Sequence, residues 1–333
     1  MLFVPVAASD PESVPTVDVV LPALNEEATI ASTICGFAAE LPFAHFIVAD
    51  NGSDDRTAEE ASRAAQACGV RFTVLSVPER GKGNAIREAF RVSSADIVVM
   101  VDADSTYPAD RVHDLMAPIT SSAADMVVGD RISDGSYSQQ NGRRFHEAGN
   151  RLVQSTINRV FGGSLNDILS GYRAFSQRFI ETYPVMVSGF ELETDLSIHA
   201  LDKRIRVAEI SVEYRDRPSG SDSKLNTFTD GARVLITLFN LFRRFRPFAF
   251  FSLVSGILLV LAALAGVLPV LDWVSARYVE HVPLAVLAAA LGLAALISFA
   301  VALVLDALAH QSRREFELRF LQAARDVQRK ASP

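Results

Sequence analysis

The chain has 333 residues and a formal net charge of -7, and 49% of its residues are hydrophobic. That length suffices for one large domain or two modest ones, and the acidic balance argues against a nucleic-acid partner. The two cysteines, Cys35 and Cys68, lack the spacing of a metal site, so we expect small reduced core residues in a reducing compartment.

The N-terminal part of the chain alternates between apolar runs and helical segments after a loose leader over residues 1–15. The runs predicted to be strands are residues 17–22, 46–49, 70–77 and the apolar core of 96–104. Each run is followed by a polar turn and then by a helix. Repeated strand–helix units of this kind form a mostly parallel sheet with helices on both faces. We therefore predict an α/β, Rossmann-like domain over residues 16–225.

Polar side chains follow each of these strands. Asn25 comes after the first strand, where it could cap the following helix. Asp50 follows the second strand, Lys82 the third, and Asp102 and Asp104 the fourth. The carboxyl ends of parallel strands meet at one edge of a sheet, so we expect the last four residues to converge there. A carboxylate pair can hold a divalent cation and a phosphate-bearing ligand, although such a pair also occurs in turns and helix caps.

Further charged residues lie in the second half of the predicted domain. Arg131 follows a strand over residues 125–128, as a phosphate contact or a surface arginine, and Asp167 and Arg173 flank a Ser-Gly turn. Glu193 opens a helix, where it either favours the helix dipole or belongs to a site. A basic segment holds Arg215, Arg217 and Lys224. These three bind phosphate oxygens or belong to a solvated loop.

The C-terminal third of the chain is strongly apolar. Residues 226–247 combine helical apolar spacing with arginines, which favours an amphipathic helix in a membrane interface over a core helix. Residues 248–309 contain two uncharged runs, 248–270 and 282–305, each long enough to cross a bilayer core of about 30 Å. Arginines flank both runs on the side of the termini, which predicts that both ends are cytoplasmic. Residues 310–333 form a charged helical tail.

Together these motifs resemble family 2 glycosyltransferases of the GT-A fold, over residues 16–245. The resemblance rests on Pro22-Ala23-Leu24-Asn25-Glu26-Glu27, Asp50-Asn51-Gly52-Ser53, Arg80-Gly81-Lys82-Gly83 and Asp102-Ala103-Asp104. A later set, Asp167-Ile168-Leu169-Ser170-Gly171-Tyr172-Arg173 and Ser223-Lys224-Leu225, resembles the subgroup that loads sugars onto polyisoprenyl phosphates. That subgroup includes dolichol-phosphate mannose synthases and bacterial undecaprenyl-phosphate glucosyltransferases. Asn51 departs from the family pattern, which often has a second Asp there.

The resemblance implies a role for each motif. A nucleotide-sugar donor, preferably a UDP-sugar, would contact Pro22, Leu24, Asn25, Glu27, Asp50, Lys82, Asp102 and Ala103. Asp102 and Asp104 would hold Mg²⁺ or Mn²⁺ against the donor diphosphate, and Asp104 and Asp167 would be the catalytic residues. The acceptor phosphate would contact Arg131, Arg173, Arg215, Arg217 and Lys224.

The predicted function is an inverting, metal-dependent membrane hexosyltransferase that uses a polyprenyl phosphate as acceptor, in the inner membrane of a bacterium and plausibly as a homo-oligomer. One alternative is a processive polysaccharide synthase of the same superfamily. Such synthases usually have a Gln-x-x-Arg-Trp motif, whereas the only tryptophan here, Trp273, follows Asp272. Another alternative is a non-catalytic membrane scaffold, which predicts a broken metal pair, yet both aspartates are present.

Overall fold

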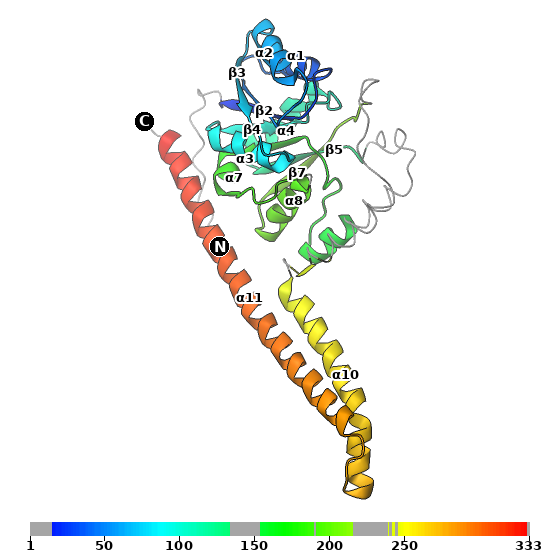
Figure 1. Ribbon diagram of the computed structural model, residues 1–333. Helices are drawn as coiled ribbons and strands as arrows, with labels where there is room; N and C mark the ends of the chain where they lie inside the picture. Colours follow the sequence, from blue (N-terminus) through cyan, green and yellow to red (C-terminus); the bar gives the residue numbers. More distant parts are fainter. Residues whose placement is uncertain are drawn as a thin grey trace. The chain divides into compact units, whose positions relative to one another are not determined.

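The computed structural model describes residues 15–133, 154–189, 191–215, 239, 242–243 and 246–331. In this part of the chain, seven strands form one sheet in the order β3-β2-β1-β4-β6-β5-β7 (Figure 1). Their bounds are Val17–Ala23 (β1), His45–Asp50 (β2), Arg71–Ser76 (β3), Ile97–Met100 (β4), Met126–Asp130 (β5), Arg173–Ser176 (β6) and Val207–Ser211 (β7). β6 is antiparallel to both of its neighbours, and all the other pairs are parallel. The mostly parallel sheet is therefore confirmed.

Alternate residues of the central strands feed two separate cores, one on each face of the sheet. Val19 of β1 and Val99 of β4 belong to the first core, with buried residues of α1 (Ile30–Glu40), α2 (Thr57–Ala67) and α4 (Val112–Thr120). Val20 and Val98 belong to the second, with buried residues of α3 (Lys82–Val92), α7 (Gln177–Thr182) and α8 (Leu192–Asp202). A short 3-10 helix, η1 (Ala109–Arg111), precedes α4.

The direction in which the sheet is built reverses between β1 and β4. The chain runs outward from β1 through β2 to β3, and then returns by α3 to place β4 on the other side of β1. Because the connecting helices change face at such a point, they leave a crevice outside the carboxyl ends of the two central strands. The motif that ends at Glu27 follows β1 to this crevice, and the Asp102-Ala103-Asp104 motif follows β4.

Two local features differ from the sequence expectations. β6 was not expected to be a strand, because it is only four residues long and begins with the charged Arg173. Asn25 does not cap α1, which begins at Ile30 with Thr29 as its N-cap residue. Instead Asn25 has a left-handed φ of 55°, and its side-chain oxygen accepts the Asp54 backbone N–H at 2.8 Å. Asn25 thus fastens the loop after β1 to the loop after β2.

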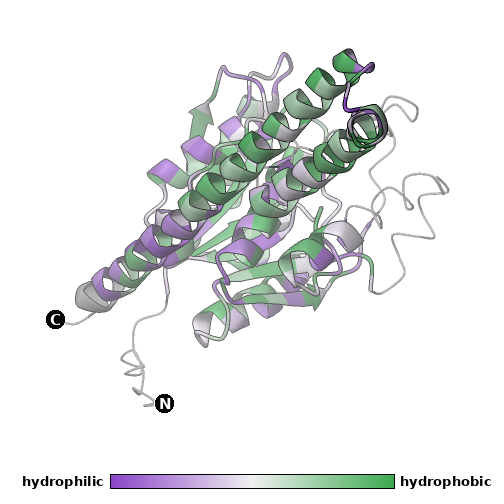
Figure 2. Cartoon of the chain, turned by 90° about the horizontal axis from the view of Figure 1, so that it is seen from below, coloured by the Kyte–Doolittle hydropathy of each residue, from purple (hydrophilic) through white to green (hydrophobic). Residues whose placement is uncertain are grey.

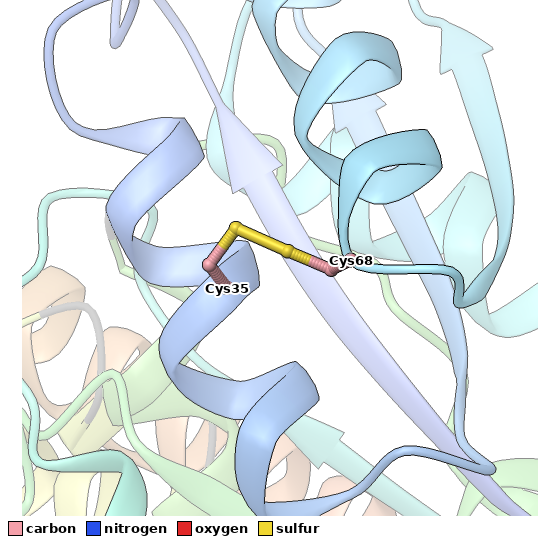
Figure 3. The surroundings of a disulfide bond; sticks show 2 residues. All are labelled: Cys35 and Cys68. Carbon is pink, nitrogen blue, oxygen red and sulfur yellow. A yellow bond between two sulfur atoms is a disulfide. The ribbon is translucent and has the colours of Figure 1, made fainter.

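The cysteines do not remain reduced core residues, so that expectation is wrong. Cys35 in α1 and Cys68 at the end of α2 form a disulfide, with their Cα atoms 6.0 Å apart (Figure 3). Cys35 is exposed and Cys68 is half-buried. The two residues are 33 positions apart in the chain, but successive crossover helices on one face of a parallel sheet are neighbours. Their separation in the sequence hides this proximity.

The chain divides into two compact units, Met1–Leu225 with Phe316–Pro333, and Asn226–Glu315. The second unit contains α10 (Pro247–Ala276) and most of α11 (Val282–Ala331). Here Ser255 Oγ donates to the Ala295 carbonyl at 2.8 Å and Ser298 Oγ to the Phe251 carbonyl at 3.0 Å. Small polar side chains of this kind join apolar helices where their backbones approach closely.

Both long helices are long and apolar enough to cross a membrane, and few of their side chains are buried. Figure 2 shows mostly hydrophobic residues along α10 and the first part of α11, with hydrophilic residues gathering toward the C-terminus. An apolar surface of this extent requires an apolar surrounding. The two predicted spans are therefore present as helices. The leader and nearly all of residues 226–247 lie outside the described residues, so the interfacial helix stays a prediction.

The predicted tail is a continuation of α11. Phe316, which is 8% exposed, joins the core on the α3, α7 and α8 face, and its ring lies 5.1 Å from that of His199. Burial lowers the pKa of His199 to about 4, so the imidazole is neutral at physiological pH. The end of a helix that begins as a candidate membrane span is thus part of the core of the first unit.

Candidate functional site

Three charged side chains from different elements meet beside the carboxyl end of β4. The Lys82 ammonium at the start of α3 contacts the Asp102 carboxylate and lies 2.5 Å from the Glu193 carboxylate in α8. Burial alone would lower the pKa of Lys82, but the charges of Asp102 and Glu193 raise it above its ordinary range. The ammonium therefore remains charged in the interior. Lys82 and Asp102 were predicted to converge, and Glu193 is their third member.

Glycines allow this cluster to form. Gly81 has a φ of 133°, and a Cβ there would lie 2.0 Å from the Ser188 carbonyl oxygen. The Gly83 N–H donates to the same carbonyl at 3.0 Å. On the other side, a Cβ on Gly171 would lie 2.2 Å from an oxygen of Asp102. The glycines of the Arg-Gly-Lys-Gly and Ser-Gly-Tyr-Arg motifs thus permit close approach to neighbouring segments.

Gly171→Ala is expected to reduce enzymatic activity while preserving the fold. The new methyl group has no room beside Asp102, so that carboxylate must rotate away from its present position. Displacement of a reacting group by about 1 Å can cost roughly 10²-fold in rate. Steady-state kinetics and thermal unfolding of the purified variant measure the two effects. Gly69→Ala is the control for strain, since Gly69 has a φ of 68° and no atom within 4 Å of its added Cβ.

Five of the predicted nucleotide-binding residues lie at the ends of β1 and β2 or in the loops that follow these strands. Pro22 lies at the end of β1, where it pairs with Ala49, and Leu24 follows the strand directly. The Asp50 carboxylate accepts the Ser53 backbone N–H at 3.2 Å. Glu27 is held by Arg56, whose Nε donates to its carboxylate at 2.9 Å, and these hydrogen bonds lower the pKa of Glu27. The two loops are therefore tied together by polar contacts.

The departure from the family pattern at Asn51 has a structural explanation. The Asn51 side chain is buried and donates to the Val77 and Glu79 carbonyls at 3.2 and 2.7 Å. Its oxygen accepts the Gly81 N–H at 2.5 Å. A carboxylate accepts hydrogen bonds but cannot donate them. An amide is thus required to connect β2 to the loop that carries Lys82.

Asn51→Asp should accordingly destabilise the protein. The substitution leaves the Val77 and Glu79 carbonyls facing a buried carboxylate instead of an amide donor, a change expected to cost about 1–3 kcal/mol. The free energy of unfolding, measured at neutral pH, should fall by that amount. An unchanged value would contradict the role assigned to the amide.

The second aspartate of the pair is more deeply placed than the first. Asp104 is 3% exposed and Ala103 is 2% exposed, whereas the Asp102 side chain is 29% exposed. An oxygen of Asp104 accepts the Thr106 hydroxyl at 2.6 Å and the Thr106 N–H at 3.2 Å. Among the described residues, no three His, Cys, Asp or Glu side chains gather as a metal cluster. A cation held here would need further ligands from a substrate or from water.

Arg131 and Asp167 form a buried ion pair at the end of β5. Arg131 Nε and a terminal nitrogen donate to the two Asp167 oxygens at 2.7 and 3.0 Å. The Arg131 guanidinium also lies 5.3 Å from the Tyr214 ring centroid. Burial alone would raise the pKa of Asp167, but the charge and hydrogen bonds of Arg131 outweigh it and lower the pKa below its ordinary value. Asp167 is thus a carboxylate with little tendency to accept a proton.

Arg173 has a structural set of contacts. Its side chain is fully buried and donates to the backbone carbonyls of Ser170, Ile168 and Glu193 at 2.7 to 3.1 Å. Arg173 was predicted to contact the acceptor phosphate, whereas these contacts favour a structural role. Arg215 is exposed and lies 3.9 Å from Asp110. Arg217 and Lys224 lie outside the described residues.

Tyr107 was not identified from the sequence, although it follows the carboxylate pair closely. Its hydroxyl accepts the Gly171 N–H at 2.9 Å, which fixes the glycine beside Asp102. Its ring lies 5.3 Å from that of Tyr172 and 5.6 Å from that of Tyr214. Tyr107 therefore links the Asp102 cluster with the Arg131–Asp167 pair. The only sequence signal was a large aromatic residue in an otherwise polar turn.

The part of the chain that contains this site is similar to known proteins. A family model described as glycosyl transferase family 2 matches residues 18–183. The glycosyltransferase AglJ of Haloferax volcanii is 34% identical over 68% of this chain and 72% of its own length. The dolichyl-phosphate hexose transferase of the same organism is 27% identical over 65% of this chain and 89% of its own.

A solved structure is also similar. Glucosyl-3-phosphoglycerate synthase from Mycobacterium tuberculosis, in complex with Mn²⁺ and UDP-glucose, superposes with a TM-score of 0.51 and 28% identity. The similarity covers 69% of this chain and 79% of that chain.

Proposed function

The chain belongs to glycosyl transferase family 2, and from this premise we propose that it transfers a sugar from a nucleotide-sugar to the phosphate of a polyisoprenyl phosphate in a membrane. The transfer would use Mg²⁺ or Mn²⁺, favour a UDP-sugar and invert the anomeric centre. The main support for the proposal is the ion pair between Lys82 and Asp102 at the carboxyl end of β4, in a chain with two exposed apolar helices.

The carboxylates suit a hard divalent cation. Mg²⁺ in such sites takes one or two carboxylates and completes its shell with substrate phosphates and water. The Lys82 ammonium is already a counterion of Asp102 in this position. Asp102 and Asp104 would thus hold the metal, which when bound supplies positive charge against the leaving diphosphate. The tied loops around Asn25, Glu27 and Asp50 offer the polar groups for base and ribose.

Asp167 would position rather than deprotonate. A phosphomonoester oxygen is already anionic near neutral pH, since its second pKa is about 6, so the attacking group needs no strong base. The lowered pKa of Asp167 and its bidentate contact with Arg131 agree with that requirement. Arg131 is thereby held in one orientation, in which it can meet an acceptor phosphate. Proximity and charge stabilisation would supply most of the rate.

The lipid acceptor follows from the second unit. Helix α10 and the first part of α11 expose many apolar side chains, and a related protein is named as a dolichyl-phosphate hexose transferase. An embedded helical hairpin would keep the enzyme at the surface where a long-chain lipid phosphate is available. Arg215, Arg217 and Lys224 precede that hairpin and would meet the phosphate. The expected topology has the catalytic domain and both termini in the cytoplasm.

The proposal is tested with purified full-length protein in detergent, labelled UDP-hexoses and GDP-hexoses, undecaprenyl phosphate and MnCl₂. Label that enters an organic extract only with metal and lipid phosphate supports it. Label in insoluble polymer would instead indicate a polysaccharide synthase. Label transferred to 3-phosphoglycerate in the absence of lipid would contradict the lipid acceptor. Absence of transfer from every donor would overturn the enzymatic function.

A further inference from the structure

Glu193 lies in the site without a role in the mechanism above. Its side chain is 7% exposed and that of Lys82 is 11% exposed, whereas the Asp102 side chain remains 29% exposed. The ion pair on the Glu193 side of Lys82 is therefore the more deeply buried of the two. An ionised carboxylate in such a position needs a partner charge, and Lys82 supplies it.

Several contacts fix Glu193 in this position independently of any ligand. Its backbone carbonyl accepts a terminal nitrogen of Arg173 at 3.1 Å and the Ser197 hydroxyl at 2.8 Å. The segment before α8 is held against α3, where Arg87 Nε donates to the Val185 carbonyl at 2.8 Å. Both partners of this ion pair thus belong to elements that are fastened together.

The Lys82 ammonium has a different relation to Asp102. If Asp102 binds a divalent cation, that cation and the ammonium compete for the same carboxylate. A buried ammonium that lost its only partner would be strongly destabilised, because breaking a buried pair costs several kcal/mol. A second carboxylate that stays with Lys82 removes this obstacle.

We propose that Glu193 is a positioning residue that retains Lys82 when Asp102 turns to the divalent cation. This inference rests on the proposed function, because it assumes a cation on Asp102. When the cation binds, Asp102 exchanges the Lys82 ammonium for the cation, and Lys82 keeps Glu193 as its partner. Lys82 remains beside the cation as a second positive charge, held by Glu193 and directed at the donor diphosphate.

The test measures Mn²⁺ affinity rather than turnover. Mn²⁺ is titrated by electron paramagnetic resonance into full-length protein in detergent, in the presence of UDP and in parallel of GDP. Glu193→Gln is expected to weaken Mn²⁺ binding by about 10–100-fold, the range for residues that support metal ligands. The double variant Glu193→Gln with Lys82→Met should recover most of that affinity, because the competing ammonium is gone. Recovery is a result that a merely structural role for Glu193 would not produce.

Glu191→Gln is the matched control, since Glu191 is exposed and precedes the same helical turn, and its Mn²⁺ affinity should equal that of the wild type. Unchanged affinity in Glu193→Gln overturns the inference, as does a double variant no better than the single one. Wild-type protein that binds no Mn²⁺ with either nucleotide overturns the metal dependence of the proposed function, and the inference falls with it. The two failures are therefore distinguishable.

Discussion

Asp102→Ala should abolish most sugar transfer and leave the fold intact. The substitution removes the more exposed carboxylate of the cation-binding pair, and loss of a group that stabilises transition-state charge costs roughly 10³-fold in rate, about 4 kcal/mol. Lys82 keeps Glu193 as a partner in this variant, so the buried ammonium does not become unpaired. Transfer of label from nucleotide-sugar to undecaprenyl phosphate measures the rate, and thermal unfolding measures the fold.

Asp104→Ala should lose a similar amount of activity with a larger loss of stability. Asp104 is buried and accepts two hydrogen bonds from Thr106, so its removal also leaves a buried donor without its acceptor. Asp114→Ala is the control for both variants, because Asp114 is an exposed residue of α4 that pairs with Arg111 at the end of η1. Wild-type rates in either aspartate variant would rule out metal binding by Asp102 and Asp104, on which the proposed function depends.

The site could be predicted in outline because parallel sheets follow simple rules. Strands that alternate with helices place their carboxyl ends on one edge, so Lys82 and Asp102 were expected to meet although the chain between them forms α3 and β4. The burial of Asp104 could not be predicted in the same way. It depends on the turn at Thr106, whose hydroxyl binds the carboxylate, and such turns leave no periodic pattern in the sequence.

The residues whose roles the sequence left open or did not reveal act through contacts between distant segments. Glu193 looked like one of several acidic residues at a helix start, where the dipole already accounts for them. Tyr107 and Asn51 make their contacts with Gly171 and with the loop after β3, which no local pattern indicates. β6 is a buried strand of four residues with an arginine at its start. Three backbone carbonyls accept hydrogen bonds from this arginine, which allows its burial. The strand therefore lacks the uniformly apolar sequence of its neighbours.

Arg131→Met is expected to cause the largest loss of stability among these variants. It leaves the Asp167 carboxylate, which is 1% exposed, without its bidentate partner. Breaking a buried pair by removing one member costs about 3–5 kcal/mol, which corresponds to a fall of about 10 °C in melting temperature for a domain of this size. Arg131→Met with Asp167→Asn should be more stable than Arg131→Met alone, because the uncompensated charge is gone. Arg56→Met, which breaks the exposed pair with Glu27, is the control and should melt with the wild type.

The pH dependence of the melting temperature is an independent test of the Arg131–Asp167 pair. In the wild type the folded pKa of Asp167 lies below the ordinary value of 3.8, so its stabilisation is present above that value and is lost as the pH falls through the folded pKa. Without the Arg131 side chain, burial is opposed only by the backbone N–H groups of residues 131 and 169 and by the charge of Arg173. The folded pKa of Asp167 should therefore rise, and its carboxylate should stabilise the fold less at neutral pH. The difference in melting temperature between wild type and Arg131→Met should therefore shrink as the pH is lowered from 7 toward 4. A difference that stays constant over this range would mean that the Arg131 side chain stabilises the fold by packing, and not through the charge of Asp167.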